Sequence, residues 1–410
     1  MNSINNTPKR KTMNVLQMIK THINGNIFLL DFATRAYFCK KNTQTIKALR
    51  PIFEIDPILD FEHFKNAVEM FKARKKQDEW LGINEIGGDS PLYGHLYSLC
   101  KYANVKQSKN TRLLLPSIEH GITWLDEINP ETLLPYIHCV ISQGSYRHNS
   151  IRKSSAIPHY VIGPYIHYAQ SCYSEQKLKE MKRKWGKTLL VFPAHTYELG
   201  KTSYSREKYV DGLLNKARND FDTIVISAYW NDVNDPTISL FKSEGAIIVS
   251  SGLREDHNFL SRLKSLILLA DATTSNTLGT NIGYSLYLEK PFLFFDAETD
   301  VRFSDLSCTE EKQYKTSSKL ESVYREGKKI FSTLNPQDPE LALQKHFYEK
   351  YWGGKLLIKS PEEIKTIILL SRQVIETTHG NVREFQNAYK KILSKTDNAI
   401  AHNLLSCALK

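Results

Sequence analysis

Glu119-His120-Gly121 places a carboxylate and an imidazole at the end of a short predicted strand in the first half of the chain. Either group, within hydrogen-bond reach of a hydroxyl, can take its proton as the hydroxyl attacks. Gly121 lets a substrate approach the backbone closely. We therefore name Glu119 and His120 as candidate catalytic bases, with Glu119 as the first choice. The alternative is a helix N-cap or a salt bridge within a loop.

A second candidate site is the small polar run from Thr273 to Thr280. An apolar run, Leu266–Ala270, precedes it, and a helical pattern that ends at Lys290-Pro291 follows it. A strand, a small loop and a helix N-terminus bind anions through free backbone N–H groups and the positive end of the helix dipole. The alternative is an ordinary connection in an α/β protein, because neither the dinucleotide nor the P-loop fingerprint is present. The candidate phosphate-binding residues are Ser275, Asn276, Thr277, Gly279 and Thr280.

Two more polar residues follow predicted strands of the second half. His195 follows Thr188–Phe192, and Arg254 follows Ala246–Ser250. A histidine can donate a hydrogen bond or a positive charge to a phosphate, and an arginine can clamp one with its planar fork. We assign both to the phosphate site, against the alternative of surface-loop residues. The stretch 231–235 superficially resembles an Asp-x-Asp metal motif, but its two aspartates are three apart before a proline, so we expect a turn and no metal.

The 410-residue chain is long enough for two domains and carries a formal net charge of +11. This charge favours an anionic partner, although no basic cluster has the aromatic interleaving of a nucleic-acid module. The six cysteines show neither disulfide nor zinc spacing and indicate reduced thiols in a cytoplasmic protein. The sequence has no apolar run of about 18 residues and no signal peptide, so we expect any membrane contact to be peripheral.

Alternating strands and helices in the second half predict βαβ units and a parallel, doubly wound sheet. The first half alternates less regularly, from a predicted strand over Asn26–Phe32 to short β segments at Cys139–Ser142 and Tyr160–Ile162. The expected fold class is therefore α/β. Ligands in such sheets lie beyond the carboxyl ends of the strands.

The phosphate-site residues, continued by Gly283, Tyr284 and Lys290-Pro291, resemble the donor-side motif of bacterial GT-B-type glycosyltransferases of surface polysaccharide synthesis. The resemblance is clearest over 187–296. It implies two Rossmann-like domains that face each other across a cleft, a base from the first domain, and a C-terminal helix that returns to it. The expected divisions are an acceptor-side domain over 1–172, a nucleotide-sugar domain over 173–380 and the helix over 381–410.

The function that this resemblance implies is the transfer of a sugar from a nucleotide-sugar donor to O-antigen, capsule or lipopolysaccharide under assembly. The expected acceptor is a glycan or a polyprenyl-linked glycan, with peripheral contact to the anionic inner membrane, no nucleic-acid partner and no cofactor. Two alternatives remain open. One is a nucleotide-sugar epimerase or a polyol-phosphate transferase on the same fold. The other is a non-catalytic binder of an anionic ligand.

Overall fold

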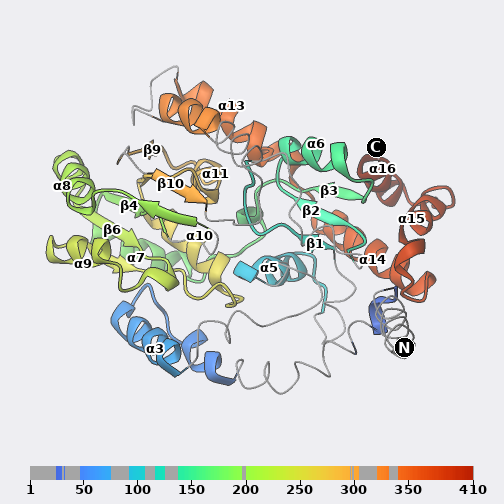
Figure 1. Cartoon of the computed structure of the whole chain (residues 1–410), viewed down its shortest axis with the longest axis horizontal. Helices are drawn as coiled ribbons and strands as arrows, with labels where there is room; N and C mark the ends of the chain where they lie inside the picture. The colour runs from blue at the N-terminus through green and yellow to red at the C-terminus, as the bar shows by residue number, and fades with distance from the viewer. Residues whose placement is uncertain are drawn as a thin grey trace, which may run out of the picture.

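The computed structural model of the protein describes residues 25–29, 32, 47–74, 92–106, 116–124, 137–195, 200–295, 297, 300–303, 321–331 and 340–409. These residues form two α/β units, each built on a parallel sheet (Figure 1). The expected α/β class with two Rossmann-like units is confirmed. None of the described helices is both long and apolar enough to span a membrane.

The larger sheet has the strand order β7-β6-β4-β8-β9, with every neighbouring pair parallel. The chain starts in the middle, builds outward to one edge, and then returns to build the other edge. The strand order therefore reverses between β4 and β8, which is the place where open α/β sheets bind their ligands. The strands are β4 (Thr188–Phe192), β6 (Thr223–Ser227), β7 (Ile247–Val249), β8 (Ala272–Ser275) and β9 (Phe292–Phe294).

Helices cover this sheet, and their ends follow local capping chemistry. Asp235 accepts a hydrogen bond from the Thr237 N–H at 2.8 Å, and Pro236 occupies the first turn of α9. Ser174 caps α7 in the same way. The helices are α7 (Glu175–Trp185), α8 (Arg206–Ala217), α9 (Pro236–Ser243), α10 (Phe259–Leu269) and α11 (Thr280–Tyr287).

The polar run after α10 differs from the expected loop. Residues Ala272–Ser275 form the buried strand β8, so only Asn276–Gly279 connect it to α11. Threonine suits a strand because its branched side chain packs well on a pleated surface. Small polar residues therefore concealed a strand in the interior of the sheet.

The smaller sheet has the order β1-β2-β3, again all parallel. It is covered by helices from both the first half and the end of the chain (Figure 1). α16 packs on β3, and Arg152 donates a 2.8 Å hydrogen bond to the Leu409 carbonyl. The elements are β1 (Ser117–Ile118), β2 (Val140–Ser142), β3 (His159–Val161), α5 (His95–Tyr102), α6 (Ser145–Ser154), α13 (Glu340–Trp352), α14 (Pro361–Thr377), α15 (Phe385–Leu393) and α16 (Ala399–Leu409).

The C-terminal return to the first unit is observed, but it is not made by a single helix. α14, α15 and α16 all pack with this unit, so the return begins well before residue 381. Asn398 starts α16 by accepting a hydrogen bond from the Ala401 N–H at 3.0 Å. A capping asparagine satisfies backbone donors at a helix start, and here it separates α15 from α16.

Residues 47–74 pack on the larger unit, although the division expected at residue 172 assigns them to the first domain. Helix α3 (Phe61–Arg74) places Phe64 and Val68 in one buried cluster with Val191 of the larger sheet. Arg262 of that unit donates to the carbonyls of Phe53 and Ile55, both at 3.1 Å. An amphipathic helix packs on whatever apolar surface it can reach. This segment therefore covers the larger sheet although it lies in the first half of the chain.

The strand expected over Asn26–Phe32 is wrong. Ile27–Leu29 are helical, and Asn26 forms an isolated bridge with Asn381. Phe28 is 43% and Phe32 73% exposed, so this apolar run does not enter a sheet. The polar residues Ser142–His148 are typical of a loop in sequence, but α6 begins among them at Ser145. The sequence also predicts that Arg112–Leu115 lead into a strand, and these four residues lie outside the described part of the chain.

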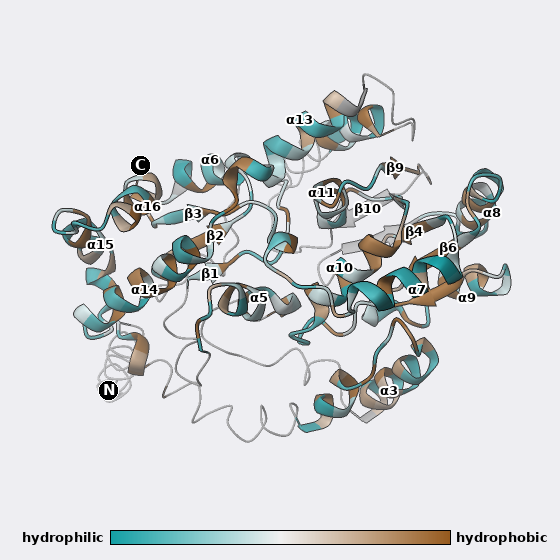
Figure 2. Cartoon of the chain, turned by 180° about the vertical axis from the view of Figure 1, so that it is seen from behind, coloured by the Kyte–Doolittle hydropathy of each residue, from teal (hydrophilic) through white to brown (hydrophobic). Residues whose placement is uncertain are grey.

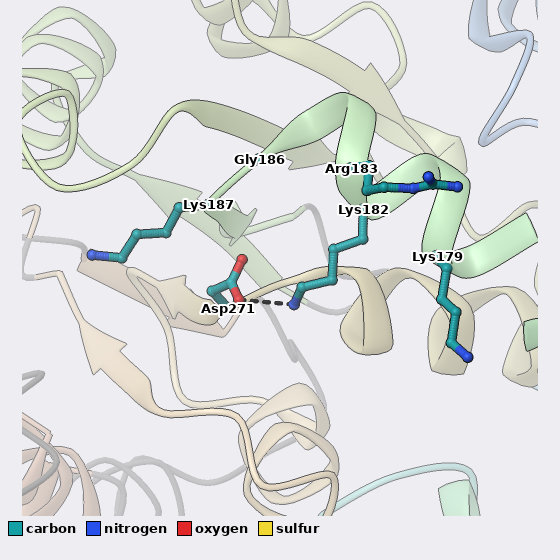
Figure 3. Close-up of a pocket in the computed structure, with 6 residues that line it drawn as sticks. All are labelled: Lys179, Lys182, Arg183, Gly186, Lys187 and Asp271. Atoms are coloured by element: carbon teal, nitrogen blue, oxygen red, sulfur yellow. Dashed lines mark hydrogen bonds and ion pairs between the residues drawn. The ribbon is translucent and has the colours of Figure 1, made fainter. Parts of the chain in front are cut away.

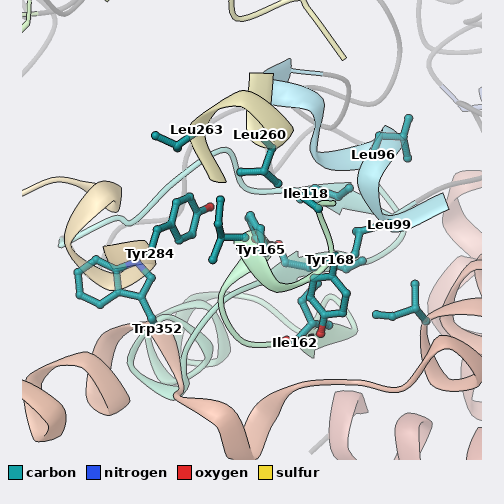
Figure 4. Close-up of a cluster of buried hydrophobic side chains, with 14 of the residues drawn as sticks. Leu96, Leu99, Ile118, Ile162, Tyr165, Tyr168, Leu260, Leu263, Tyr284 and Trp352 are labelled. Atoms are coloured by element: carbon teal, nitrogen blue, oxygen red, sulfur yellow. Dashed lines mark hydrogen bonds between the residues drawn. The ribbon is translucent and has the colours of Figure 1, made fainter. Parts of the chain in front are cut away.

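One buried cluster spans the two units, in addition to the separate cluster that α3 forms with the larger sheet. Leu260 and Tyr284 of the larger unit lie in the same buried cluster as Ile118 and Tyr165 of the smaller unit (Figure 4). Trp352, at the end of α13, completes this cluster. The shared core holds the two sheets in a defined relative position.

Gly283 in α11 is the closest approach within this core, because a Cβ at this position would overlap the Trp352 indole ring. We expect Gly283→Ala to lower the free energy of unfolding by about 1–3 kcal/mol, the usual cost of overpacking a core. Urea denaturation measures this cost. The same substitution in a Trp352→Leu background should cost much less, and an equal cost in both backgrounds would contradict the contact.

Candidate functional site

The loop after β1 and the start of α11 touch each other. Thr280 Oγ1 accepts a hydrogen bond from the Ile122 N–H at 3.0 Å, and Trp124 Nε1 donates to the Leu278 carbonyl at 3.3 Å. A Cβ on Gly121 would lie 2.8 Å from Thr280 Oγ1. Gly121 is therefore needed for close approach, but to the protein's own α11 and not to a substrate in this state. The two sequence motifs, far apart in the chain, meet in space.

The polar residues of the donor-side loop are engaged with the protein itself. Ser275, Asn276 and Thr277 are all buried. Ser275 Oγ accepts from the Thr277 N–H at 3.1 Å, and Asn276 Oδ1 accepts from the Ala194 N–H at 2.7 Å. These three residues shape the loop and tie the end of β8 to the end of β4. They leave the start of α11 as the part of the motif that a ligand can reach.

Gly279, Thr280 and Asn281 are partly exposed at the start of α11, which no side chain caps. An uncapped helix start presents N–H donors and the positive end of the dipole. The amide nitrogen of Asn281 is buried and has no hydrogen-bond partner in the structure. Other buried side-chain donors of the described residues also lack a partner, so this amide is open to an acceptor but does not by itself mark a site. The sequence motif contained Asn281, but nothing in the pattern singled it out.

His195 lies at the reversal of strand order. It follows β4, and its ring stacks on Tyr229, which follows β6, with centroids 4.4 Å apart. The adjacent Ala194 N–H is the group bound by Asn276. His195 therefore occupies the position where ligands bind in sheets of this topology. Tyr229, at the end of β6, thus contacts a histidine of the same unit.

Tyr93 joins the two halves of the site, and the sequence analysis missed it. Its ring stacks on His120 with centroids 5.7 Å apart, it shares a side-chain hydrogen bond with Tyr229, and its N–H donates to the Arg254 carbonyl at 2.5 Å. Burial raises the pKa of its hydroxyl well above the usual value, so Tyr93 stays neutral. Its φ of 56° is a non-helical conformation directly before α5. Such strained positions cluster at functional sites.

Arg254 is placed near the site but not as an isolated cation. Its side chain forms a 3.0 Å ion pair with Glu255, and the two side chains are 15% and 8% exposed. The neighbouring carboxylate balances the arginine charge. Capture of a phosphate by Arg254 would therefore compete with this pair, and the backbone carbonyl that holds Tyr93 is the clearer contribution of this residue.

Glu119 and His120 have different surroundings although they are neighbours in sequence. Both oxygens of Glu119 accept hydrogen bonds from Arg147, at 2.6 to 2.9 Å, and both side chains are buried. A proton accepted by Glu119 would leave the Arg147 charge buried without its partner, which is costly. His120 is exposed at the same strand end. The structure thus differs from the expected accessible carboxylate and leaves the imidazole as the accessible group.

The contacts described above do not include a set of metal ligands. Within the described ranges, no group of three His, Cys, Asp or Glu side chains is placed to hold a metal ion. The nitrogen and oxygen atoms at the start of α11 and in His195 suit an anion instead, because they are donors. The donor set therefore fits phosphate chemistry.

Comparisons with known proteins give one solved structure to report. No protein-family model matches the chain, and no curated protein matches it. The solved structure of the wall teichoic acid polymerase TagF aligns with a TM-score of 0.35 and 14% sequence identity. The alignment covers 60% of this chain and 59% of that one. The chain thus spans little more than half of the TagF structure, and a likeness at this level leaves the reading of the site to its own geometry.

A histidine pair, with His159 buried and His148 half-buried, lies beside the Glu119–Arg147 ion pair. The rings of His148 and His159 stack at 4.9 Å, with their Nδ1 atoms 3.0 Å apart. Burial lowers the pKa of both rings. The charge of His148 and of Arg147 lowers that of His159 further.

This pair predicts a loss of stability in acid. Because the folded-state pKa of both rings lies below the usual 6.5, the unfolded chain binds more protons as the pH falls through that value. Their contribution is complete above about pH 6.5 and is lost progressively below it. Urea denaturation from pH 7.5 to 5 measures this. His159→Gln should show a shallower fall than the wild type, and an identical fall in both would contradict the assignment.

Proposed function

We propose that the protein is a metal-independent glycosyltransferase, which moves a sugar from a nucleotide-sugar donor to a hydroxyl of a growing surface glycan. The contact between the start of α11 and the loop after β1 carries this proposal. It brings a helix terminus suited to a diphosphate and an exposed imidazole suited to a hydroxyl into one place. Sugar transfer from such a donor needs both groups.

On the donor side, the diphosphate lies at the start of α11, against Gly279 and Thr280. The uncapped N–H groups and the unpartnered amide of Asn281 donate to its oxygens. His195 donates from the end of β4. As the bond between the sugar carbon and the phosphate oxygen breaks, its electron pair passes to the diphosphate, and these donors stabilise the growing charge.

On the acceptor side, His120 takes the proton of the acceptor hydroxyl while the hydroxyl oxygen bonds to the sugar carbon. Glu119 acts as a positioning residue, because its ion pair with Arg147 ties the end of β1 to α6. Tyr93 stacks on His120 and bonds to Tyr229, which keeps the acceptor base beside the donor unit.

The acceptor that we propose is O-antigen, capsule or lipopolysaccharide under assembly, as a glycan or a polyprenyl-linked glycan. The enzyme would then act in the cytoplasm with peripheral contact to the anionic inner membrane. A phosphate-bearing donor and acceptor match the net charge of +11 without a nucleic-acid partner. The reaction requires no cofactor beyond the donor.

A thermal-shift screen with UDP, GDP, CMP, CDP and dTDP compounds, including CDP-alcohols, tests the donor side. The matching nucleotide should stabilise the folded protein by about 2.7 kcal/mol at a hundredfold excess over its dissociation constant. Gly279→Val should abolish this shift without unfolding the protein, because its side chain would occupy the phosphate position. An unchanged increase in melting temperature in the folded variant would exclude the α11 site. An increase with a CDP-alcohol alone would indicate a polyol-phosphate transferase.

Substitutions at the strand ends test the division of roles. His120→Gln should lower kcat by ~10²–10⁴ with little change in donor affinity, as expected for loss of a base. His195→Ala should weaken donor affinity as well as rate. Glu119→Gln should act mainly through stability, costing about 3–5 kcal/mol by leaving Arg147 unpaired. A near-wild-type kcat in His120→Gln would place the base elsewhere.

A further inference from the structure

A basic groove lies at the amino end of the larger sheet, away from the candidate site. It is a shallow depression, open to solvent, with a volume of about 700 Å³, and it is lined by Lys179, Lys182, Arg183, Gly186, Lys187 and Asp271 (Figure 3). Gly186 and Lys187 precede β4, and Asp271 precedes β8. The five residues of β4 span ~16 Å, so the groove and His195 lie at opposite ends of the same strand. We call this hollow the amino-edge groove.

The single carboxylate of the groove already has its partners. Asp271 accepts a 2.8 Å hydrogen bond from Lys182 Nζ and a 2.9 Å hydrogen bond from the Thr188 N–H. Burial opposes its ionisation, but these two bonds hold the pKa of Asp271 below the usual value. Asp271 is therefore a charged structural group that anchors α7 to the sheet. It neutralises one of the four cations in the groove.

The other three cations lack a carboxylate partner. Among the described residues, no acidic side chain lies within ion-pair distance of Lys179, Arg183 or Lys187, all of which are exposed. Lys187 instead lies over the Phe221 ring, with 5.2 Å between Nζ and the centroid. Nearby Lys290 has its pKa lowered by burial and, next, by the charge of Lys182. The residues that line the groove thus carry more positive than negative charge, although the Asp222 carboxylate lies beside Gly186 and accepts a 2.7 Å hydrogen bond from the Lys187 N–H.

Helix stability accounts for only part of this charge. Cations near a helix C-terminus interact favourably with the helix dipole, and Lys182, Arg183 and Lys184 occupy the last turn of α7. Lys179 precedes that turn, and Lys187 follows the helix. The polar surface of α7 is visible along its length in Figure 2. Lys179, Arg183 and Lys187 line one depression, and the helix dipole does not explain this arrangement.

We propose that the amino-edge groove binds a linear polyphosphate chain. Lys187 extends to one side of Asp271, whereas Lys179 and Arg183 extend to the other (Figure 3). A chain lying along the groove therefore meets cations on both sides. Lysine binds phosphate as a point charge, and arginine as a planar fork. This site is separate from the proposed transferase site and does not depend on it.

A chain fits this groove better than a membrane surface does. No exposed large apolar side chain of the described residues lines the groove.

Binding of a fluorescently labelled polyphosphate chain tests the proposal, with two triple variants of equal charge change. The groove variant is K179E/R183E/K187E, and the control is K390E/K391E/K395E, three exposed lysines at the end of α15 and beyond. We expect the groove variant to bind about tenfold or more weakly, with a flatter dependence of affinity on salt, because fewer phosphates are contacted. The control should bind within about twofold of the wild type.

Several results would overturn the proposal. Equal losses in the two variants would show an effect of net charge alone, and no binding by the wild type would exclude the site. If the wild type bound phosphatidylserine vesicles but not polyphosphate, and the groove variant lost the vesicle binding, the groove would be a membrane-binding surface instead. Melting temperatures exclude misfolding, and the milder Arg183→Gln/Lys187→Gln variant repeats the test. If the groove variant keeps the increase in melting temperature that a nucleotide gives the wild type, the groove and the site at α11 are independent.

Discussion

The shared hydrophobic core between the two sheets is the constraint on which the rest of the molecule depends. Tyr165 of the smaller unit and Tyr284 of the larger one lie in one buried cluster, closed by Trp352. Gly283 lets the indole pack against the backbone of α11. Because this packing sets where α11 lies, it also sets which strand ends face each other. The hydrogen bond from Ile122 to Thr280 can form only in that arrangement.

Charge is distributed unequally along the larger sheet. At the carboxyl end, the donors are mostly neutral and shaped by hydrogen bonds, such as Asn276 to Ala194, and the arginine has its own carboxylate. At the amino end, exposed lysines surround one carboxylate that Lys182 already neutralises. A neutral, ordered donor set suits stabilisation of charge that develops during a reaction, whereas mobile cations suit binding of a charged chain. The two ends are therefore built for different tasks.

The ion pair between Glu119 and Arg147 shows how burial changes a residue's role. A carboxylate beside an imidazole at a strand end has two possible functions, as base or as structural anchor. The structure buries the carboxylate and both its oxygens meet the guanidinium. The cost of separating a buried pair makes Glu119 an anchor and leaves the exposed His120 to meet a substrate. Exposure, which depends on packing, decides between chemically similar neighbours.

Periodicity in the sequence determined the parallel sheet of the second half, because β4, β6 and α10 follow the apolar patterns of 188–192, 223–227 and 259–269. Local chemistry also located His195 and the start of α11 at strand ends. Tertiary structure alone decided the contacts of Tyr93 and the packing of α3 on the larger sheet. Contacts between segments distant in sequence decide such features, and local patterns carry no record of them. Strand β8 was concealed for a related reason, since buried threonines have the composition of a loop but the packing of a strand.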